Sequence, residues 1–482
     1  MRSSSCRVGA VDKTSAKITF VSLSTVAPTV TCSGGNVVVG TPSDRYNNGG
    51  LSVATTLITI TELSQFTKYT YSITQGSDVI NGSFTTAPDE TQDFSFIVAS
   101  CDSPYITNSN NPWPTIRGLM NDDAYPMLAM FHIDDVNYVD TIWILDQSGI
   151  RTSGNTALEG PQTTGLGRDY AAGWAHYYGL IAGQGTRRAL TKTADSDRHY
   201  VFQNLPSFVS GGDHAIENNH CRGALVNGVP NSDYNGCDRT PGTGLEDVAV
   251  AEWNAFLGDA NPTPLRTDKL HWGCEIGCVK FALFDYSLYS QPYDSVLDDD
   301  VVGYGSEQID DIMTYLSDTH DFKVMLMESP PTTFGQPWKD WHETEAAAWK
   351  ATFDADDNLN GTDSNCFSVA GDNHALYCQS HDTFWNFTAG SLQTNNVGHN
   401  MEGASSVAVL ANNWSGQNRF SKHAVAQTGD QLFGGFWHFK VTAGVKIEAS
   451  CYHNNGSILV KNITLTKGAA NNQWTMPRAK FA

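Results

Sequence analysis

The sequence predicts a small all-β sandwich followed by a larger layered domain of strands and helices, an α+β or α/β sandwich. Residues 1–90 carry short runs in which apolar and polar residues alternate, separated by Gly, Pro, Ser and Asn turns. This period of two is typical of half-buried strands. From residue 94 onward, apolar runs alternate with segments of helical spacing. The polar stretch 88–92 breaks both patterns, so we expect two domains, 1–90 and 91–482.

The individual elements follow from the same periods. In the first domain we expect strands at 17–21, 56–60 and 69–73. In the second domain we expect buried strands at 94–99, 127–133, 281–284, 323–327 and 367–370, and helices at 244–258, 306–318 and 338–353. Alternating runs at 436–441, 445–449 and 458–461 predict further strands of this domain rather than an independent unit. Sites in α/β sheets lie beyond the carboxyl ends of the strands, so we expect functional residues in those loops.

Charge and hydropathy narrow the classes of partner. The chain has 29 basic and 51 acidic residues and a net charge of -22, so we expect no binding to a nucleic-acid backbone or to an anionic membrane surface. The acidity reflects solubility or a saline habitat, or it includes carboxylates that bind hard cations. The sequence lacks a run of about 18 apolar residues, so no membrane span is expected. Its first residues also lack the apolar segment of a secretory signal.

Ten cysteines are too few for a disulfide-built scaffold of this length. A disulfide between Cys6 and Cys32 would stabilise the first domain. Cys274 and Cys278 are expected to form a local disulfide or to remain as two buried thiols. Cys101 differs from these because it ends the strand expected at 94–99. It is either a metal ligand or a buried, inert thiol.

Three further polar motifs follow expected strands. The pair Asp134-Asp135 provides carboxylates that can bridge two cations, or it simply caps a turn. Gly-Gly-Asp-His at 211–214 lets the backbone turn close to a metal, or it is a capped turn with a solvated histidine. In Gly-Asp-Asn-His at 371–374, Asp372 and His374 occupy alternate positions and face one side of an extended segment. Together with Cys101, these motifs are typical of a multi-metal hydrolytic site.

The order of the motifs resembles the alkaline phosphatase D (PhoD)-like metallophosphoesterases, over essentially the whole chain. Ala-Ser-Cys at 99–101 is similar to the strand-end Ser-Cys of that family, and 134–140 to its Gly-Asp-x-x-Tyr-x-Asp. Residues 170–177 resemble its Tyr-Arg helix, 212–219 its Asp-Asp-His-Glu-x-x-Asn-Asn, and 371–374 its Gly-Asp-x-His. The first domain resembles the fibronectin III-like or Ig-like β-sandwich that precedes several such domains. The resemblance implies a metallophosphoesterase-like fold, with two central sheets flanked by helices.

The resemblance also implies a site and a chemistry. The site would hold iron, bound partly by a Cys thiolate and a Tyr phenolate, beside calcium, although other divalent metals suit the same ligands. Carried over by position, the metal-ligand candidates are Cys101, Asp135, Tyr170, Asp213, Asn218, Asp372 and His374. The catalytic residues implied are Asp135, which would bridge the metals, and His214, which would assist phosphate binding or protonation of the leaving group. The implied reaction is hydrolysis of a small phosphomonoester or phosphodiester by metal-bound hydroxide.

Four residues depart from the family pattern. Asp134 stands where the family has Gly, Gly212 where it has Asp, Ala215 where it has Glu, and Ser287 where we expect the Arg of a phosphate clamp. An alternative is therefore a catalytically weakened domain, which serves as a metal-stabilised structural or surface-binding component of a virion or other assembly. The resemblance implies an extracellular or surface location, whereas the missing signal favours a virion component.

Overall fold

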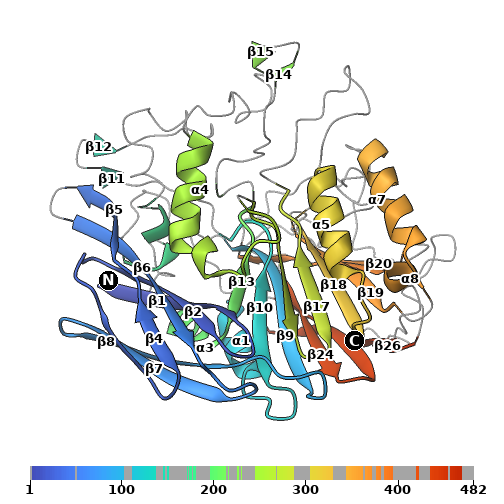
Figure 1. The fold of residues 1–482 in the computed structure, drawn as a ribbon, viewed down its shortest axis with the longest axis horizontal. Helices are drawn as coiled ribbons and strands as arrows, with labels where there is room; N and C mark the ends of the chain where they lie inside the picture. The colour runs from blue at the N-terminus through green and yellow to red at the C-terminus, as the bar shows by residue number, and fades with distance from the viewer. Residues whose placement is uncertain are drawn as a thin grey trace. The chain divides into compact units, whose positions relative to one another are not determined.

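We describe the fold from a computed structural model, in which the chain divides into two compact units (Figure 1). The first unit contains Met1–Ala87, Ser103–Thr107 and Asp135–Pro262, and the second contains Pro88–Asp102, Asn108–Asp134 and Thr263–Ala482. The structure describes residues 3–48, 51–102, 111–136, 145–146, 149–150, 171, 173–175, 177–180, 196–212, 215, 225–226, 229–230, 245–267, 269–286, 304–328, 343–361, 364–371, 376–380, 385–393, 419–422, 435–453 and 456–468. Among these residues, no helix combines the length and the apolar character needed to cross a membrane.

The first unit contains two antiparallel sheets. One has the order β1-β2-β6-β4 with β5 beside β6, and the other has the order β3-β7-β8. Their strands are β1 (Ser4–Val11), β2 (Ala16–Ser22), β3 (Thr29–Cys32), β4 (Asn36–Val39), β5 (Ser43–Asn48), β6 (Leu51–Thr61), β7 (Lys68–Gln75) and β8 (Asp78–Thr85). A shared core joins the sheets, with Val8 and Ile58 from the first and Tyr71 and Phe84 from the second. The expected all-β region is therefore present, while its fibronectin III type stays a prediction.

The same unit also contains α3 (Ser196–Asn204), β13 (Ser207–Val209), α4 (Leu245–Phe256) and the short helix η4 (Gly258–Ala260). Almost every residue of β1 is buried, because the later segment packs against it. The buried Arg7 guanidinium donates to the Ser207 carbonyl at 2.8 Å, and the Tyr71 hydroxyl donates to the Gln203 carbonyl at 2.9 Å. Two-residue strands at Leu145–Asp146, Gly149–Ile150, Leu225–Val226 and Val229–Pro230 form two small hairpins.

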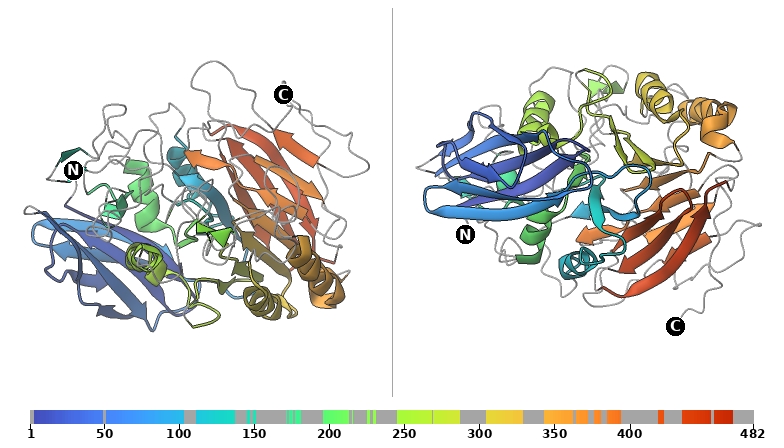
Figure 2. Two further views of the ribbon diagram at one scale, coloured as in Figure 1. Left: turned by 90° about the horizontal axis from the view of Figure 1, so that it is seen from above. Right: turned by 60° about the horizontal axis from the view of Figure 1, so that its bottom comes forward.

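The second unit has two larger mixed sheets. The first has the order β10-β9-β24-β25-β26 with β22 beside the end of β9, and its C-terminal strands are red in Figure 2. Its strands are β9 (Phe94–Asp102), β10 (Met127–His132), β22 (Ser391–Gln393), β24 (Gly435–Thr442), β25 (Lys446–His453) and β26 (Ile458–Thr466). The second has the order β16-β17-β18-β19-β21-β20-β23. Its strands are β16 (Trp272–Ile276), β17 (Val279–Leu283), β18 (Phe322–Met327), β19 (Cys366–Ala370), β20 (Leu376–Ser380), β21 (Trp385–Thr388) and β23 (Arg419–Lys422).

Aromatic side chains from both sheets form the core between them. Phe96 of β9 lies 4.9 Å from Phe281 of β17 and 4.8 Å from Phe439 of β24, measured between ring centroids. Phe131 of β10 stacks on Phe281 at 4.4 Å, and Phe387 of β21 meets Phe439 at 5.4 Å. All five rings are buried. The sheets therefore pack face to face, as the sequence predicts.

Helices cover the outer face of the second sheet (Figure 1). They are α5 (Ser306–Leu316), α7 (Glu343–Ala355) and α8 (Asp357–Asn360), while α1 (Trp113–Leu119) follows β9 along the chain. In α5 the buried residues Ile309, Ile312, Met313 and Leu316 recur at helical spacing. They pack on Met325 of β18 in one apolar cluster. Within the described residues this gives the expected arrangement of mixed sheets with helices.

The expected elements at 94–99, 127–133, 281–284, 323–327 and 367–370 correspond to β9, β10, β17, β18 and β19. The expected helices at 244–258 and 306–318 correspond to α4 and α5, and the described part of 338–353 belongs to α7. The runs near the C-terminus form β24, β25 and β26, which continue the sheet of β9. Cys32, Cys274 and Cys278 are free thiols, so the Cys6–Cys32 bridge and the local Cys274–Cys278 disulfide are wrong. Cys6 instead lies 3.4 Å from the Tyr71 hydroxyl.

Candidate metal centre

Cys101 lies at the end of β9, a strand in which every residue is buried. Its Sγ is 3.6 Å from Asp134 Oδ2, and its backbone N–H donates to the Asp134 carbonyl at 3.3 Å. The neighbouring Ser100 Oγ lies 3.1 Å from the Ala389 carbonyl oxygen and 3.3 Å from the Cys101 sulfur. Because β22 also pairs with the end of β9, two strands and the loop after β10 hold this thiol in place.

Asp134 and Asp135 follow β10 and are almost fully buried, at 3% and 2% exposure. Both have a left-handed backbone, with φ values of 63° and 40°, as does Cys101 with 51°. Such conformations cost energy in residues other than Gly, and they cluster at functional sites. Asp134 stands where the PhoD-like pattern has glycine, and glycine adopts such a positive φ without strain.

Gly371 brings a third remote segment to this pair. A Cβ atom at this position would lie 2.6 Å from Asp134 Cβ, 3.2 Å from Asp134 Oδ2 and 3.2 Å from the Ile133 carbonyl oxygen. Only a residue without a side chain permits this approach. Gly371 opens the Gly-Asp-Asn-His motif, so the start of that motif lies beside Asp134.

The donor atoms of this cluster suit a metal ion. One ligand atom from each of Cys101, Asp134 and Asp135 lies within 4.8 Å of the other two, and all three residues are buried. A buried group of one thiolate and two carboxylates is costly unless a cation compensates its charge. Sulfur favours transition metals, while carboxylate oxygen also suits harder ions. The residues therefore fit an iron-type or zinc-type ion.

The other predicted site residues lie outside the described part of the chain. They are Tyr170, Asp213, His214, Asn218, Asp372 and His374, together with Ser287. Their roles stay predictions. Two residues of the 212–219 motif are described: Gly212 has a φ of 68°, and the Ala215 N–H donates to the Gly212 carbonyl at 3.3 Å. Gly212 thus has the positive φ that glycine adopts without strain.

The sequence interpretation missed several buried carboxylates at strand ends. Asp134 belongs to the acidic pair that the sequence singles out, but the ligand set implied by the resemblance omits it, whereas its carboxylate is the one near the Cys101 sulfur. Asp102, Asp285 and Glu328 end β9 or follow β17 and β18, and they are 0%, 4% and 2% exposed. The signal that could have found them is an acidic residue directly after a buried apolar run.

A second acidic group has a different character. Glu275, Asp318 and His320 also bring ligand atoms within 4.8 Å of one another, but they are exposed or half-buried. The Lys280 ammonium lies 3.5 Å from Glu275 and contacts Asp318. Since a lysine already compensates these carboxylates, we assign this group to surface ion pairing.

Comparisons with known proteins support the fold. No protein-family model matches the chain, and a search of curated proteins finds no significant match. Among solved structures, the purple acid phosphatase PPD1 from yellow lupin (Lupinus luteus) seeds has a TM-score of 0.54 at 12% identity, over 96% of this chain and 74% of that chain. GAP50, the anchor in the inner membrane complex of Plasmodium, has a TM-score of 0.37 at 8% identity, over 79% of this chain and 90% of that chain.

The likeness to the purple acid phosphatase shows a metallophosphoesterase-like α+β fold. At this identity it is evidence for the fold alone. The PhoD-like type remains a prediction from the sequence motifs.

Proposed function

We propose that this protein is a metal-dependent phosphoester hydrolase of the PhoD-like type. The observation that carries the proposal is the position of Cys101 Sγ, 3.6 Å from Asp134 Oδ2, with Gly371 against Asp134. The fold supports it because a solved structure with a similar fold is a purple acid phosphatase. The substrate class is a small phosphomonoester or phosphodiester.

In this proposal Cys101, Asp134 and Asp135 would hold an iron-type ion, and Asp135 would also contribute to binding calcium. A bound metal ion lowers the pKa of water and neutralises charge that develops on the phosphate. Strand pairing on either side of Cys101 and the close approach of Gly371 to Asp134 would hold these ligands in place. His214 would hold or donate a proton near the leaving oxygen, and Asp213, Asp372 and His374 would complete the ligand set.

The departures at Ala215 and Ser287 bear on the rate. Without the arginine of the family, Ser287 supplies no bidentate phosphate contact, so the bound ions would carry more of the phosphate charge. The role of a structural component in a virion and the extracellular or surface location have no observation in their favour among the described residues, and they stay predictions.

Metal analysis and an activity assay test the proposal together. The purified chain is analysed for metals by mass spectrometry and assayed on p-nitrophenyl phosphate and bis-p-nitrophenyl phosphate, with and without chelator. We expect bound metal, a visible charge-transfer band from an iron-ligand bond, and hydrolysis that the chelator and Asp135→Asn both abolish. The matched control is Asp318→Asn, which removes a carboxylate from the surface group around Lys280 and leaves the metal content unchanged. Metal-loaded protein that hydrolyses neither compound contradicts the proposal.

A further inference from the structure

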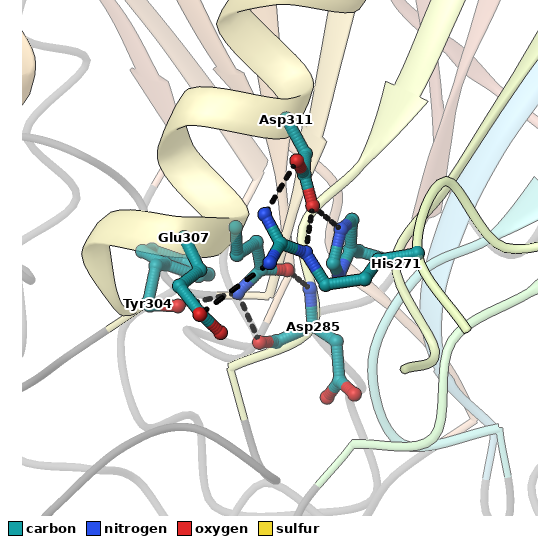
Figure 3. Close-up of polar contacts among 7 residues, drawn as sticks. His271, Asp285, Tyr304, Glu307 and Asp311 are labelled. Atoms are coloured by element: carbon teal, nitrogen blue, oxygen red, sulfur yellow. Dashed lines mark hydrogen bonds and ion pairs between the residues drawn. The ribbon is translucent and has the colours of Figure 1, made fainter. Parts of the chain in front are cut away.

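The loop after β17 is held by an unusual amide contact. Gln308, on the first turn of α5, is fully buried. Its Oε1 accepts the Asp285 N–H at 2.6 Å, and its Nε2 donates to the Asp285 carbonyl at 2.9 Å and to the Tyr304 carbonyl at 2.7 Å. The side-chain amide thus pairs with Asp285 as another strand would. Figure 3 shows the Asp285 carboxylate pointing away from these contacts.

Two further carboxylates secure the same region. The Glu345 carboxylate of α7 accepts the N–H groups of Tyr304 and Gly305 at 2.8 and 2.7 Å, which fixes the start of α5. Glu328, directly after β18, accepts the Tyr286 N–H at 2.9 Å. Successive backbone N–H groups of this loop are therefore bound by side chains from α5 and from the end of β18. Such double anchoring positions a loop rather than merely filling space.

Strand register relates Asp285 to the candidate metal centre. Leu283 of β17 pairs with Leu326 of β18, and Met327 of β18 pairs with Ala370 of β19. The strands are parallel, so the same register extended beyond the strand ends aligns Asp285 with Glu328, and Glu328 with Gly371. Gly371 in turn lies against Asp134. Asp285 is thus two strand spacings, roughly 10 Å, from the segment that contacts the centre.

We propose that Gln308 is a positioning residue of the metal centre, which holds the Asp285 carboxylate where its negative charge strengthens cation binding. The inference rests on the proposed function only in requiring a metal ion at Cys101 and Asp134. The centre lies one contact beyond Gly371, and over roughly 10–15 Å inside a protein one unit charge changes the affinity for a cation by about tenfold.

Mn²⁺ binding to the metal-depleted full chain, measured by titration calorimetry, tests the inference. Asp285→Asn and Gln308→Leu should each weaken Mn²⁺ binding about tenfold. The double variant Asp285→Asn/Gln308→Leu should bind no more weakly than Asp285→Asn, because Gln308 acts through that carboxylate. Ile309→Ala, which removes core packing from the same turn of α5, should leave the Mn²⁺ affinity unchanged. Gln308→Glu keeps the acceptor oxygen and replaces Gln308→Leu if that variant does not fold.

Several results would overturn the inference. One is a Gln308→Leu variant that binds Mn²⁺ as tightly as the wild type. Another is a double variant that binds Mn²⁺ more weakly than Asp285→Asn. A third is an Ile309→Ala variant that loses as much Mn²⁺ affinity as Gln308→Leu. If Asp285→Asn and Gln308→Leu weaken Mn²⁺ binding without adding in the double variant, but the wild type hydrolyses no phosphoester, the inference stands and the proposed function is wrong. If the wild type hydrolyses phosphoesters but these variants bind Mn²⁺ normally, the proposed function stands and the inference is wrong. A wild-type chain that binds no Mn²⁺ contradicts both.

Discussion

Gly371 and Asp134 approach each other so closely that a Cβ atom on residue 371 would lie 2.6 Å from the Asp134 Cβ. One residue follows β19 and the other follows β10, so this approach joins the carboxyl ends of the two sheets of the second unit. The Cys101 sulfur lies 3.6 Å from Oδ2 of the same Asp134. The geometry of the candidate centre therefore depends on the absence of a side chain at position 371.

Gly371→Ala should displace Asp134 and weaken metal binding. Overpacking of this kind costs about 1–3 kcal/mol of stability. The matched control is Gly118→Ala in α1, where an added Cβ meets nothing within 4 Å and should stabilise the protein by about 0.5–1 kcal/mol. Thermal unfolding and metal content of both variants check the prediction. Equal behaviour of the two variants would contradict it.

Asp134→Gly separates backbone strain from metal binding. The φ of 63° at Asp134 is relieved by glycine, so the metal-free protein should gain about 1 kcal/mol of stability. The loss of the carboxylate should weaken metal binding at least tenfold, because even the loss of a residue that only supports a metal ligand weakens binding by about that factor.

The control for Asp134→Gly is Glu62→Gly. Glu62 has a similar φ of 60° and is exposed in the first unit. This variant should gain similar stability while metal binding stays unchanged. Undiminished metal affinity in Asp134→Gly would show that Asp134 is not a ligand. Chemical denaturation and metal titration measure the two effects separately.

The strand ends of the candidate centre were predictable because an apolar run followed by polar residues marks both the strand and its edge. This signal found Cys101 and the Asp134-Asp135 pair. The same signal is present at Glu328, but a lone acidic residue is far less specific than a motif. Left-handed backbone at Cys101 and at both aspartates could not be read from residue types that seldom adopt it.

Gln308 could not be predicted for a different reason. In the sequence it is one polar residue in an amphipathic helix, where solvent exposure is the usual outcome. Its burial depends on how the start of α5 packs over the end of β17, a contact between remote segments. Likewise, alternation at 436–441 predicts a strand, but it does not predict that nearly every residue of β24 is buried.

His438 makes stability depend on pH. Burial, together with the Lys440 charge, lowers its pKa to about 4, while Asp122 acts in the opposite direction. The folded state therefore keeps the imidazole neutral, and the unfolded state takes up a proton below its ordinary pKa of about 6.5. The contribution of the neutral His438 to the free energy of unfolding is fully present above about pH 6.5. It is lost as the pH falls toward about 4, and the loss reaches roughly 3 kcal/mol.

Thermal unfolding at pH 7 and pH 5 checks this dependence. The wild type should lose more stability than His438→Leu between these values, by about 2 kcal/mol. Asp122 and Lys440 form an ion pair of 2.6 Å beside the histidine, and Tyr452 lies with its ring centroid 6.0 Å away. None of these three groups changes in the variant, so the difference isolates the histidine. Parallel pH profiles of the two proteins would contradict the assignment.

Asp311 of α5 ties the start of β16 to the helix layer (Figure 3). Its carboxylate accepts from Arg266 at 2.7 and 2.9 Å and lies 3.0 Å from Nε2 of the buried His271. Asp311→Asn should cost about 1–3 kcal/mol, because a buried imidazole loses its charged partner. Burial already lowers the pKa of His271, and Asp311 opposes that effect, so the variant should lower this pKa further.

Glu307→Gln is the matched control for Asp311→Asn, since it changes the other acidic partner of the same arginine. The Arg266–Glu307 pair is 3.4 Å long with side chains 41% and 62% exposed, and such exposed pairs contribute about 0–1 kcal/mol. Thermal unfolding of the two variants should therefore differ clearly, and nuclear magnetic resonance titration of His271 should shift only in Asp311→Asn. Equal losses of stability in the two variants would contradict the prediction. They would show that the contact between Asp311 and the buried His271 adds no more stability than the exposed Arg266–Glu307 pair, so that apolar packing alone holds β16 against α5.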